Sequence, residues 1–138
     1  MTMVKISSAQ LKRIEKALAS VPFAQLLQLE LENVESGSAI LALTVRKELT
    51  QNHGILHGGA IASLIDTATA FAILSVIPPR DRVTTVDLTI SYLRPVSEGR
   101  IRAVAKVVRA GRRLFVVSAE VFANGKLATT ALSTYIKV

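Results

Sequence analysis

The centre of the chain begins with Gln51-Asn-His-Gly-Ile-Leu-His57-Gly58-Gly59 and continues as a long apolar run to Ile77. Between Gly58 and Ile77, Asp66 is the only charged residue. Removing a lone carboxylate from water is costly, so an unpaired one often marks a functional site. Two plainer roles remain open for Asp66: capping a neighbouring loop, or reaching solvent at a helix edge. The glycine pair favours a site, because amides at the start of a helix can bind an incoming oxygen atom.

The apolar run predicts a helix over residues 59–77, which Pro78-Pro79 ends. This helix is hydrophobic on all sides, and such a helix has to be buried on all sides. Only one short helix is expected elsewhere, so a sheet must wrap around the long one. The predicted fold class is therefore α+β, an antiparallel β-sheet wrapped around one long central α-helix.

The remaining segments predict one N-terminal helix and a series of strands. Ser7 and Ser8 are candidate N-caps of the helix, which ends before Pro22. Asn124-Gly125 is a strong signal for a two-residue hairpin turn. The whole chain, residues 1–138, is predicted to form a single domain in which residues 1–22 are the helical N-terminal part. The expected strands span residues 29–34, 39–45, 82–93, 100–109, 113–123 and 126–136.

The composition narrows the class of protein. Half of the residues are hydrophobic and a fifth are charged, which indicates a packed globular chain and argues against disorder. The absence of cysteine excludes disulfides and thiolate chemistry, and it is compatible with a cytoplasmic location. No secretory signal is recognisable in residues 1–16, and the charge of Asp66 argues against a membrane span over residues 58–77.

The net charge of +7 indicates either a solvated basic surface or an anionic partner. With four Phe, two Tyr and no Trp, the chain has little aromatic surface for stacking bases. A phosphate-bearing small molecule is therefore favoured over nucleic acid. The clustered cations are Arg94, Arg100, Arg102, Lys106, Arg109, Arg112 and Arg113.

The spacing of Gly58 and Asp66 points to a symmetric dimer. Eight residues of helix separate the two by about 12 Å, too far for one carbonyl group to touch both. Either they are unrelated, or an antiparallel helix of a second copy completes the site. A stripe of short residues would allow such an approach, although it would equally accommodate the chain's own sheet. The stripe consists of Gly59, Ala62, Ser63, Asp66, Thr69 and Ala70.

From about Phe23 to its C-terminus, the chain resembles the hotdog-fold acyl-CoA thioesterases, in particular the PaaI-like (phenylacetic acid degradation) branch. The resemblance rests on the motif from Gln51 to Asp66, on Val83-Thr-Thr-Val-Asp-Leu-Thr-Ile-Ser-Tyr-Leu-Arg-Pro95, and on Gly111-Arg112. It implies a hotdog fold and hydrolysis of an aryl- or aliphatic acyl-CoA to the free acid and CoA. It also implies a homodimer, often a dimer of dimers, and no cofactor, because CoA is part of the substrate.

The same resemblance implies catalytic roles. Asp66 matches the family's carboxylate, which acts either as nucleophile or as general base on water. The N–H of Gly58 matches the oxyanion donor, and His57 supports the site. Gln51 matches the amide that helps hold the thioester, with Asn52 as the alternative one position along.

Further site residues are implied by position. Thr85 matches a hydroxyl that positions water or substrate. The acyl pocket is expected to be lined by residues such as Ile61, Leu64, Ile65 and Phe71. The residues implied in binding CoA are Gly59, Tyr92, Arg94, Arg109, Gly111, Arg112 and Arg113.

Three other functions compete with this interpretation. An acyl-CoA-binding sensor on the same fold needs no carboxylate beside the thioester, so the complete motif favours catalysis. A hydratase on this fold is disfavoured because the loop typical of dehydratases is not seen in the sequence. A nucleic-acid binder is disfavoured because aromatic residues are scarce. His53 and His57 lack a convincing carboxylate or thiolate partner, so no metal site is expected.

Overall fold

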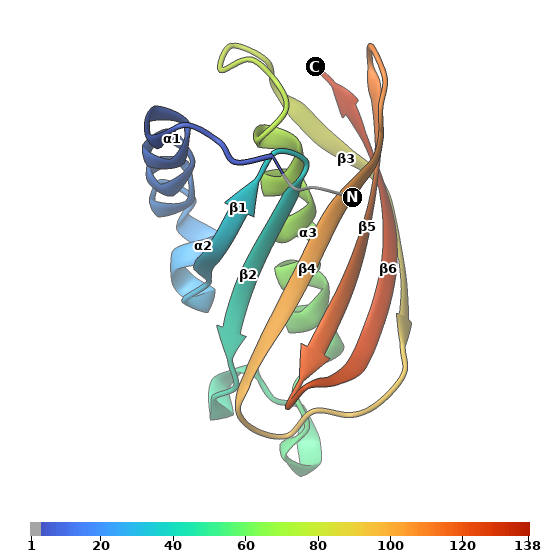
Figure 1. The fold of residues 1–138 in the computed structure, drawn as a ribbon. Helices are drawn as coiled ribbons and strands as arrows, with labels where there is room; N and C mark the ends of the chain where they lie inside the picture. Colours follow the sequence, from blue (N-terminus) through green and yellow to red (C-terminus); the bar gives the residue numbers. More distant parts are fainter. Residues whose placement is uncertain (1–3) are drawn as a thin grey trace.

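A six-stranded antiparallel sheet curves around one long helix, α3, which spans Gly58–Leu74 (Figure 1). The strands lie in the order β1-β2-β4-β5-β6-β3, so β1 and β3 form the two edges. The predicted fold class is confirmed. The strands are β1 (Glu30–Glu35), β2 (Ser38–Thr44), β3 (Val83–Tyr92), β4 (Arg100–Ala110), β5 (Leu114–Ala123) and β6 (Lys126–Lys137).

Two helices precede the sheet in this computed structural model, which describes residues 4–138. Helix α1 (Ser8–Ala19) is capped by Ser7 as expected, whereas α2 (Pro22–Leu27) was not predicted. Pro22 both follows the first helix and opens the second, because proline fits the first turn of a helix without losing a needed hydrogen bond. Residues 1–3, the start of the segment predicted to lack a secretory signal, lie outside the described residues.

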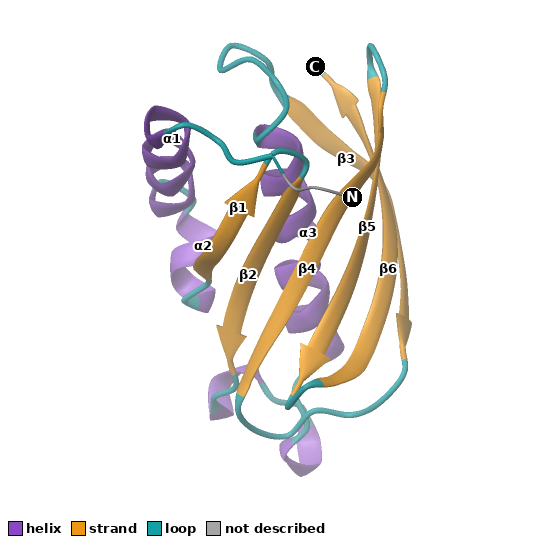
Figure 2. Cartoon of the chain, in the orientation of Figure 1, coloured by secondary structure: helices purple, strands orange, loops and turns teal. Residues whose placement is uncertain are grey.

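Helix α3 packs against the concave face of the sheet (Figure 2). Its buried side chains include Leu64, Ile65 and Ala68, which meet inward-facing residues such as Leu41 and Val117. The helix ends at Leu74, three residues before the predicted end. Pro78 accounts for this, because its ring would clash with the carbonyl of the residue four positions earlier.

The prediction that α3 is buried on all sides is wrong for a single chain. The sheet covers one side of the helix (Figure 1). A stripe of residues along the helix keeps partial solvent contact. Thr69, which the sequence assigned to this stripe, is instead fully buried. The residues of the stripe that solvent reaches are Gly59, Ala62, Ser63, Asp66 and Ala70.

Strand β3 joins the sheet only through β6, so its outer edge is unpaired within the described chain. A bulge between Thr85 and Asp87 shifts its register. Thr85 lies opposite Tyr135 in this pairing, and both side chains face α3. The β5–β6 turn has Asn124 and Gly125 at φ 53° and 75°, which confirms the predicted two-residue hairpin.

Candidate active site

The His57-Gly58-Gly59 motif forms the N-terminus of α3. The Nδ1 atom of His57 accepts a hydrogen bond from the N–H of Gly59 at 2.8 Å and so caps the helix. A Cβ atom at position 59 would lie 2.9 Å from that nitrogen, which explains why glycine is needed there. Because Nδ1 is the acceptor, the proton of a neutral His57 lies on Nε2.

The N–H of Gly58 is the amide that this arrangement leaves available to bind an oxygen atom of a ligand. The N–H groups of Gly59 and Ala60 bond to His57, at its Nδ1 and its carbonyl oxygen respectively. Within residues 4–138 the N–H of Gly58 has no acceptor. It lies at the positive end of the α3 dipole, where a developing negative charge is stabilised.

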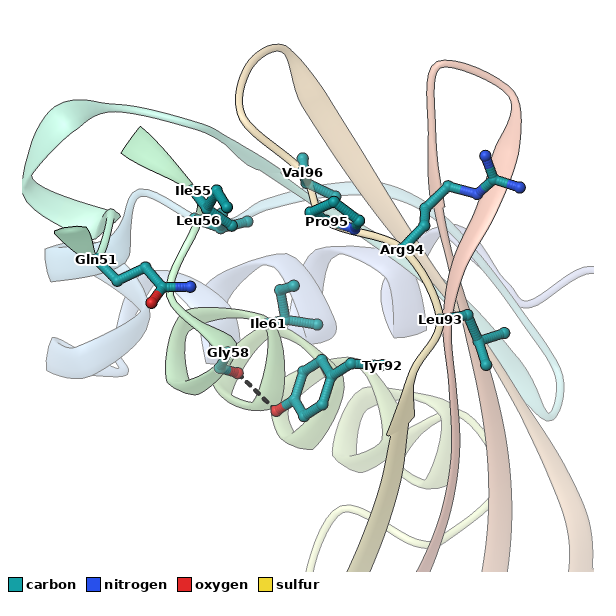
Figure 3. A pocket seen from close by; sticks show the side chains of 10 residues that line it. All are labelled: Gln51, Ile55, Leu56, Gly58, Ile61, Tyr92, Leu93, Arg94, Pro95 and Val96. Carbon is teal, nitrogen blue, oxygen red and sulfur yellow. Dashed lines mark hydrogen bonds between the residues drawn. The ribbon is translucent and has the colours of Figure 1, made fainter. Parts of the chain in front are cut away.

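A cavity of about 420 Å³ opens beside this amide (Figure 3). Gln51 and Tyr92 line it from opposite sides, whereas Asn52 belongs to the short 3₁₀ turn Asn52–Gly54 and does not line it. The hydroxyl of Tyr92 donates to the carbonyl of Gly58 at 2.8 Å. A Cβ at position 58 would lie 3.2 Å from the Tyr92 ring, so glycine at this position permits the close packing. The lining residues are Gln51, Ile55, Leu56, Gly58, Ile61, Tyr92, Leu93, Arg94, Pro95 and Val96.

Asp66 is not part of that cavity. It lies eight residues further along α3, where its Oδ1 accepts a hydrogen bond from Thr85 at 2.8 Å. Tyr135 approaches the same oxygen at 3.1 Å and donates to the backbone carbonyl of Asp66 at 2.6 Å. Hydroxyl groups, rather than a cation, therefore hold the carboxylate. The structure brings the Thr85 hydroxyl, which was predicted to position water or substrate, onto Asp66, but it does not bring Asp66 to Gly58.

Tyr135 is the residue that sequence reasoning missed. It is 2 % exposed, and burial raises the pKa of its hydroxyl to about 12. Its position on the inward face of the last strand was a usable signal, because a buried tyrosine hydroxyl needs a hydrogen-bond partner.

Apart from Gly59, which lies in the first turn of α3, the predicted CoA-binding residues fall into two groups at opposite ends of the sheet. Tyr92 and Arg94 lie by the cavity, and the N–H of Arg94 donates to the carbonyl of Ala128 on β6. Lys137, nine residues further along β6, donates to the carbonyl of Arg113. Nine residues of strand span about 30 Å, so one chain does not gather both groups. The far group lies at the β4–β5 turn and comprises Arg109, Gly111, Arg112 and Arg113 (Figure 1).

Two of the clustered cations are already neutralised. Arg100 pairs with Glu30 and Glu32, and Arg102 pairs with Glu32 at 2.6 Å. Although partial burial opposes it, hydrogen bonds from Arg100 and Arg102 hold the pKa of Glu32 below its ordinary value. These pairs correct the view that the whole basic stretch serves an anionic partner.

The predicted acyl-pocket residues are mostly core residues. All four are buried, Leu64 and Ile65 fully and Ile61 and Phe71 to 4 % exposure, and of the four only Ile61 lines the cavity. A second hollow, of about 270 Å³, lies on the other side of the α3 N-terminus. Its apolar wall comes from Phe23, Leu27, Leu49 and Ala60, and His57, Gly59 and Ser63 also line it.

Residues 4–138 contain no group of three His, Cys, Asp or Glu side chains placed to hold a metal ion. No helix among them is both long enough and apolar enough to cross a membrane.

Comparison with known proteins places this geometry in context. Residues 53–129 match the family described as the thioesterase superfamily. The medium/long-chain acyl-CoA thioesterase YigI of Salmonella typhimurium is 32% identical, over 84% of this chain and 85% of its own length. The structure of Escherichia coli PaaI, from the phenylacetic acid degradation operon, superposes with a TM-score of 0.86 at 25% identity, covering 95% of each chain. A variant of PaaI from Thermus thermophilus has a TM-score of 0.79 at 30% identity, covering 86% of this chain and all of the other.

Proposed function

The chain belongs to the thioesterase superfamily and is a thioester hydrolase with the hotdog fold, and we propose that it hydrolyses acyl-CoA to a free acid and CoA. The observation that carries the proposal is the N–H of Gly58, unpaired within residues 4–138, beside a cavity that Arg94 also lines. An amide at a helix N-terminus suits a thioester oxygen that gains charge during attack. A cation in the wall of the same cavity suits the phosphates of CoA.

The catalytic centre is proposed to be shared between two copies of the chain. Gly58 and Asp66 lie on one straight helix, about 12 Å apart along its axis. The small residues of the exposed α3 stripe allow an antiparallel helix to approach closely. A twofold axis would then set the partner's Asp66 against Gly58 and Gln51 of this chain, and create the same site twice.

In this site the thioester oxygen accepts from the N–H of Gly58 and from the amide of Gln51. The partner's Asp66 either removes a proton from water as it attacks, or itself attacks the carbonyl carbon. The bond between carbon and sulfur breaks, and the CoA sulfur leaves as a thiolate and takes up a proton. When water attacks, this step releases the acid directly. When Asp66 attacks, a mixed anhydride remains on its carboxylate, and a water molecule then hydrolyses it to release the acid. His57 acts by capping α3 and fixing the direction of the Gly58 N–H.

The two arms of the substrate are proposed to leave on opposite sides of the α3 N-terminus. The CoA arm follows the cavity past Tyr92 to Arg94. In the antiparallel dimer the partner's β4–β5 turn comes to the same end, so Arg109, Arg112 and Arg113 of each chain serve the other chain's site. The acyl group takes the second hollow, whose wall is largely apolar and whose charged lining residue, Glu48, is already paired with Arg46 at 3.3 Å.

A panel assay tests the function. Release of free CoA would be measured from aryl-, short-chain and medium-chain acyl-CoAs, with the wild-type protein and with Asp66→Asn. We expect turnover of at least one class, and a loss of at least about 10³-fold in kcat for Asp66→Asn. A protein that binds acyl-CoA but releases no CoA from any of them would instead be a sensor. Wild-type turnover by Asp66→Asn would remove the carboxylate from its role.

A further inference from the structure

The hydroxyl of Tyr135 lies at the centre of a buried polar group behind Asp66. It is within hydrogen-bond distance of the Asp66 carbonyl (2.6 Å), the Asp66 Oδ1 (3.1 Å) and the Thr69 Oγ1 (2.7 Å). Tyr135 is 2 % exposed and Thr69 is fully buried, so water does not compete freely for these contacts. The family resemblance assigned no role to either residue.

Counting protons fixes the direction of the hydrogen bonds. The raised pKa of Tyr135, about 12, keeps its hydroxyl protonated at neutral pH. Of the three neighbouring oxygens, only the two of Asp66 lack a proton of their own, so Tyr135 donates its single proton to Asp66. That proton is shared between the carbonyl at 2.6 Å and Oδ1 at 3.1 Å. Thr69 in turn donates to Tyr135 or to the Ile65 carbonyl, which lies 2.9 Å away.

The two donors to Oδ1 are a cross-strand pair. Thr85 on β3 lies opposite Tyr135 on β6, so the register of these two strands sets both hydroxyls under one carboxylate oxygen. Within the described residues, Oδ2 has no hydrogen-bond partner, and no lysine, arginine or histidine forms an ion pair with Asp66. The carboxylate is therefore held by one oxygen and presents the other.

We propose that Tyr135 is a positioning residue, which fixes the Asp66 carboxylate through Oδ1 so that Oδ2 is the oxygen that reacts. The inference rests on the proposed function, in which Asp66 is the catalytic carboxylate. Tyr135 does not touch the substrate. The shorter branch of the same hydrogen bond, to the Asp66 carbonyl, ties α3 to β6 at the residue whose placement decides the reaction.

The test is Tyr135→Phe, which removes one oxygen and keeps the ring. We expect kcat to fall about tenfold with KM unchanged within twofold, because the substrate contacts remain. The acidic limb of the kcat profile should move to higher pH, because a carboxylate that loses a donated hydrogen bond is protonated more readily. In an Asp66→Asn background, Tyr135→Phe should cause little further loss.

A matched control is Ser133→Ala, two residues earlier on the same face of β6. Ser133 is also buried, but its hydroxyl donates to the Asp87 carbonyl and not to the carboxylate. It should leave kcat and the pH profile unchanged. If Tyr135→Phe fails to fold, Thr69→Val removes the hydroxyl behind Tyr135 and should move the profile in the same direction by less.

The outcomes separate the two proposals. Wild-type protein that hydrolyses no acyl-CoA would overturn the proposed function. Active wild type with an unchanged kcat and pH profile in Tyr135→Phe would overturn only the positioning role. A fall in kcat with an unmoved acidic limb, matched by Ser133→Ala, would also overturn it, because that result needs only a general loss of packing.

Discussion

A shared active site predicts that two inactive chains can restore activity to each other. The perturbation is a mixture of Asp66→Asn and Gln51→Ala chains, unfolded and refolded together in equal amounts. Each variant alone should be nearly inactive, because one lacks the carboxylate and the other lacks the amide beside Gly58. The axial separation of about 12 Å between Gly58 and Asp66 requires the two defects to affect different halves of each site.

The expected magnitude follows from random pairing. Half of the dimers contain one chain of each kind. In such a dimer, one site combines the intact Asp66 of one chain with the intact Gln51 of the other, while both defects meet in the second site. Half of the dimers with one of two sites intact give about a quarter of wild-type activity. If each site belonged to a single chain, every site would carry one defect and no activity would return.

A second mixture tests the same geometry by loss of activity. Chains carrying both substitutions would be refolded with an equal amount of wild-type chain, and CoA release would be followed with the best acyl-CoA substrate. In a shared site every mixed dimer is inactive, so about a quarter of the activity of an all-wild-type sample remains. Sites within single chains would leave about half. Differently tagged chains would show that mixed dimers form. The shared site would be refuted if such dimers gave no recovered activity in the first mixture and half of the activity in the second. A fully active monomer would do the same.

Three further predictions concern smaller parts of the molecule. Replacing Arg94, Arg112 or Arg113 singly by Ala should raise KM for acyl-CoA more than it lowers kcat. High salt should have the same effect on the wild-type protein. An unchanged KM in all three variants would indicate that these arginines form a plain solvated surface. Gly59→Ala should lower kcat at least tenfold, because a Cβ 2.9 Å from His57 Nδ1 displaces the cap of α3. The control Gly125→Ala, in a turn far from the site, should change stability only. Glu32→Gln should lower the free energy of unfolding at pH 7 by about 0.5–1 kcal/mol. Because the pKa of Glu32 is depressed on folding, this difference should vanish as pH falls below 4.5 through the lowered value. A difference that persists in acid would contradict the ion-pair explanation.

Much of the fold could be predicted because its signals are local. Apolar runs, Pro78 and Asn124-Gly125 depend on a few neighbouring residues, and the strands they predict agree closely with β1 to β6. The surroundings of Asp66 could not be predicted in the same way. Thr85 and Tyr135 meet beneath the carboxylate only because a bulge after Thr85 sets the register of β3 against β6. Register is a property of the paired strands, and neither strand's sequence states it alone.

The exposed stripe of α3 shows where a hydropathy argument reaches its limit. An apolar helix has to be covered, but its sequence does not say whether its own sheet or a second chain covers it. The sheet leaves Gly59, Ala62, Ser63 and Ala70 in partial contact with solvent, and these side chains are so short that little apolar area is exposed. Short side chains also keep the gap between two such helices narrow. Asp66 is the one charged group on this stripe, and its Oδ2 is the oxygen left without a partner in the described chain. A stripe of short side chains exposes little apolar area in a single chain and lets two such helices pack closely, which is what a catalytic site divided between subunits needs.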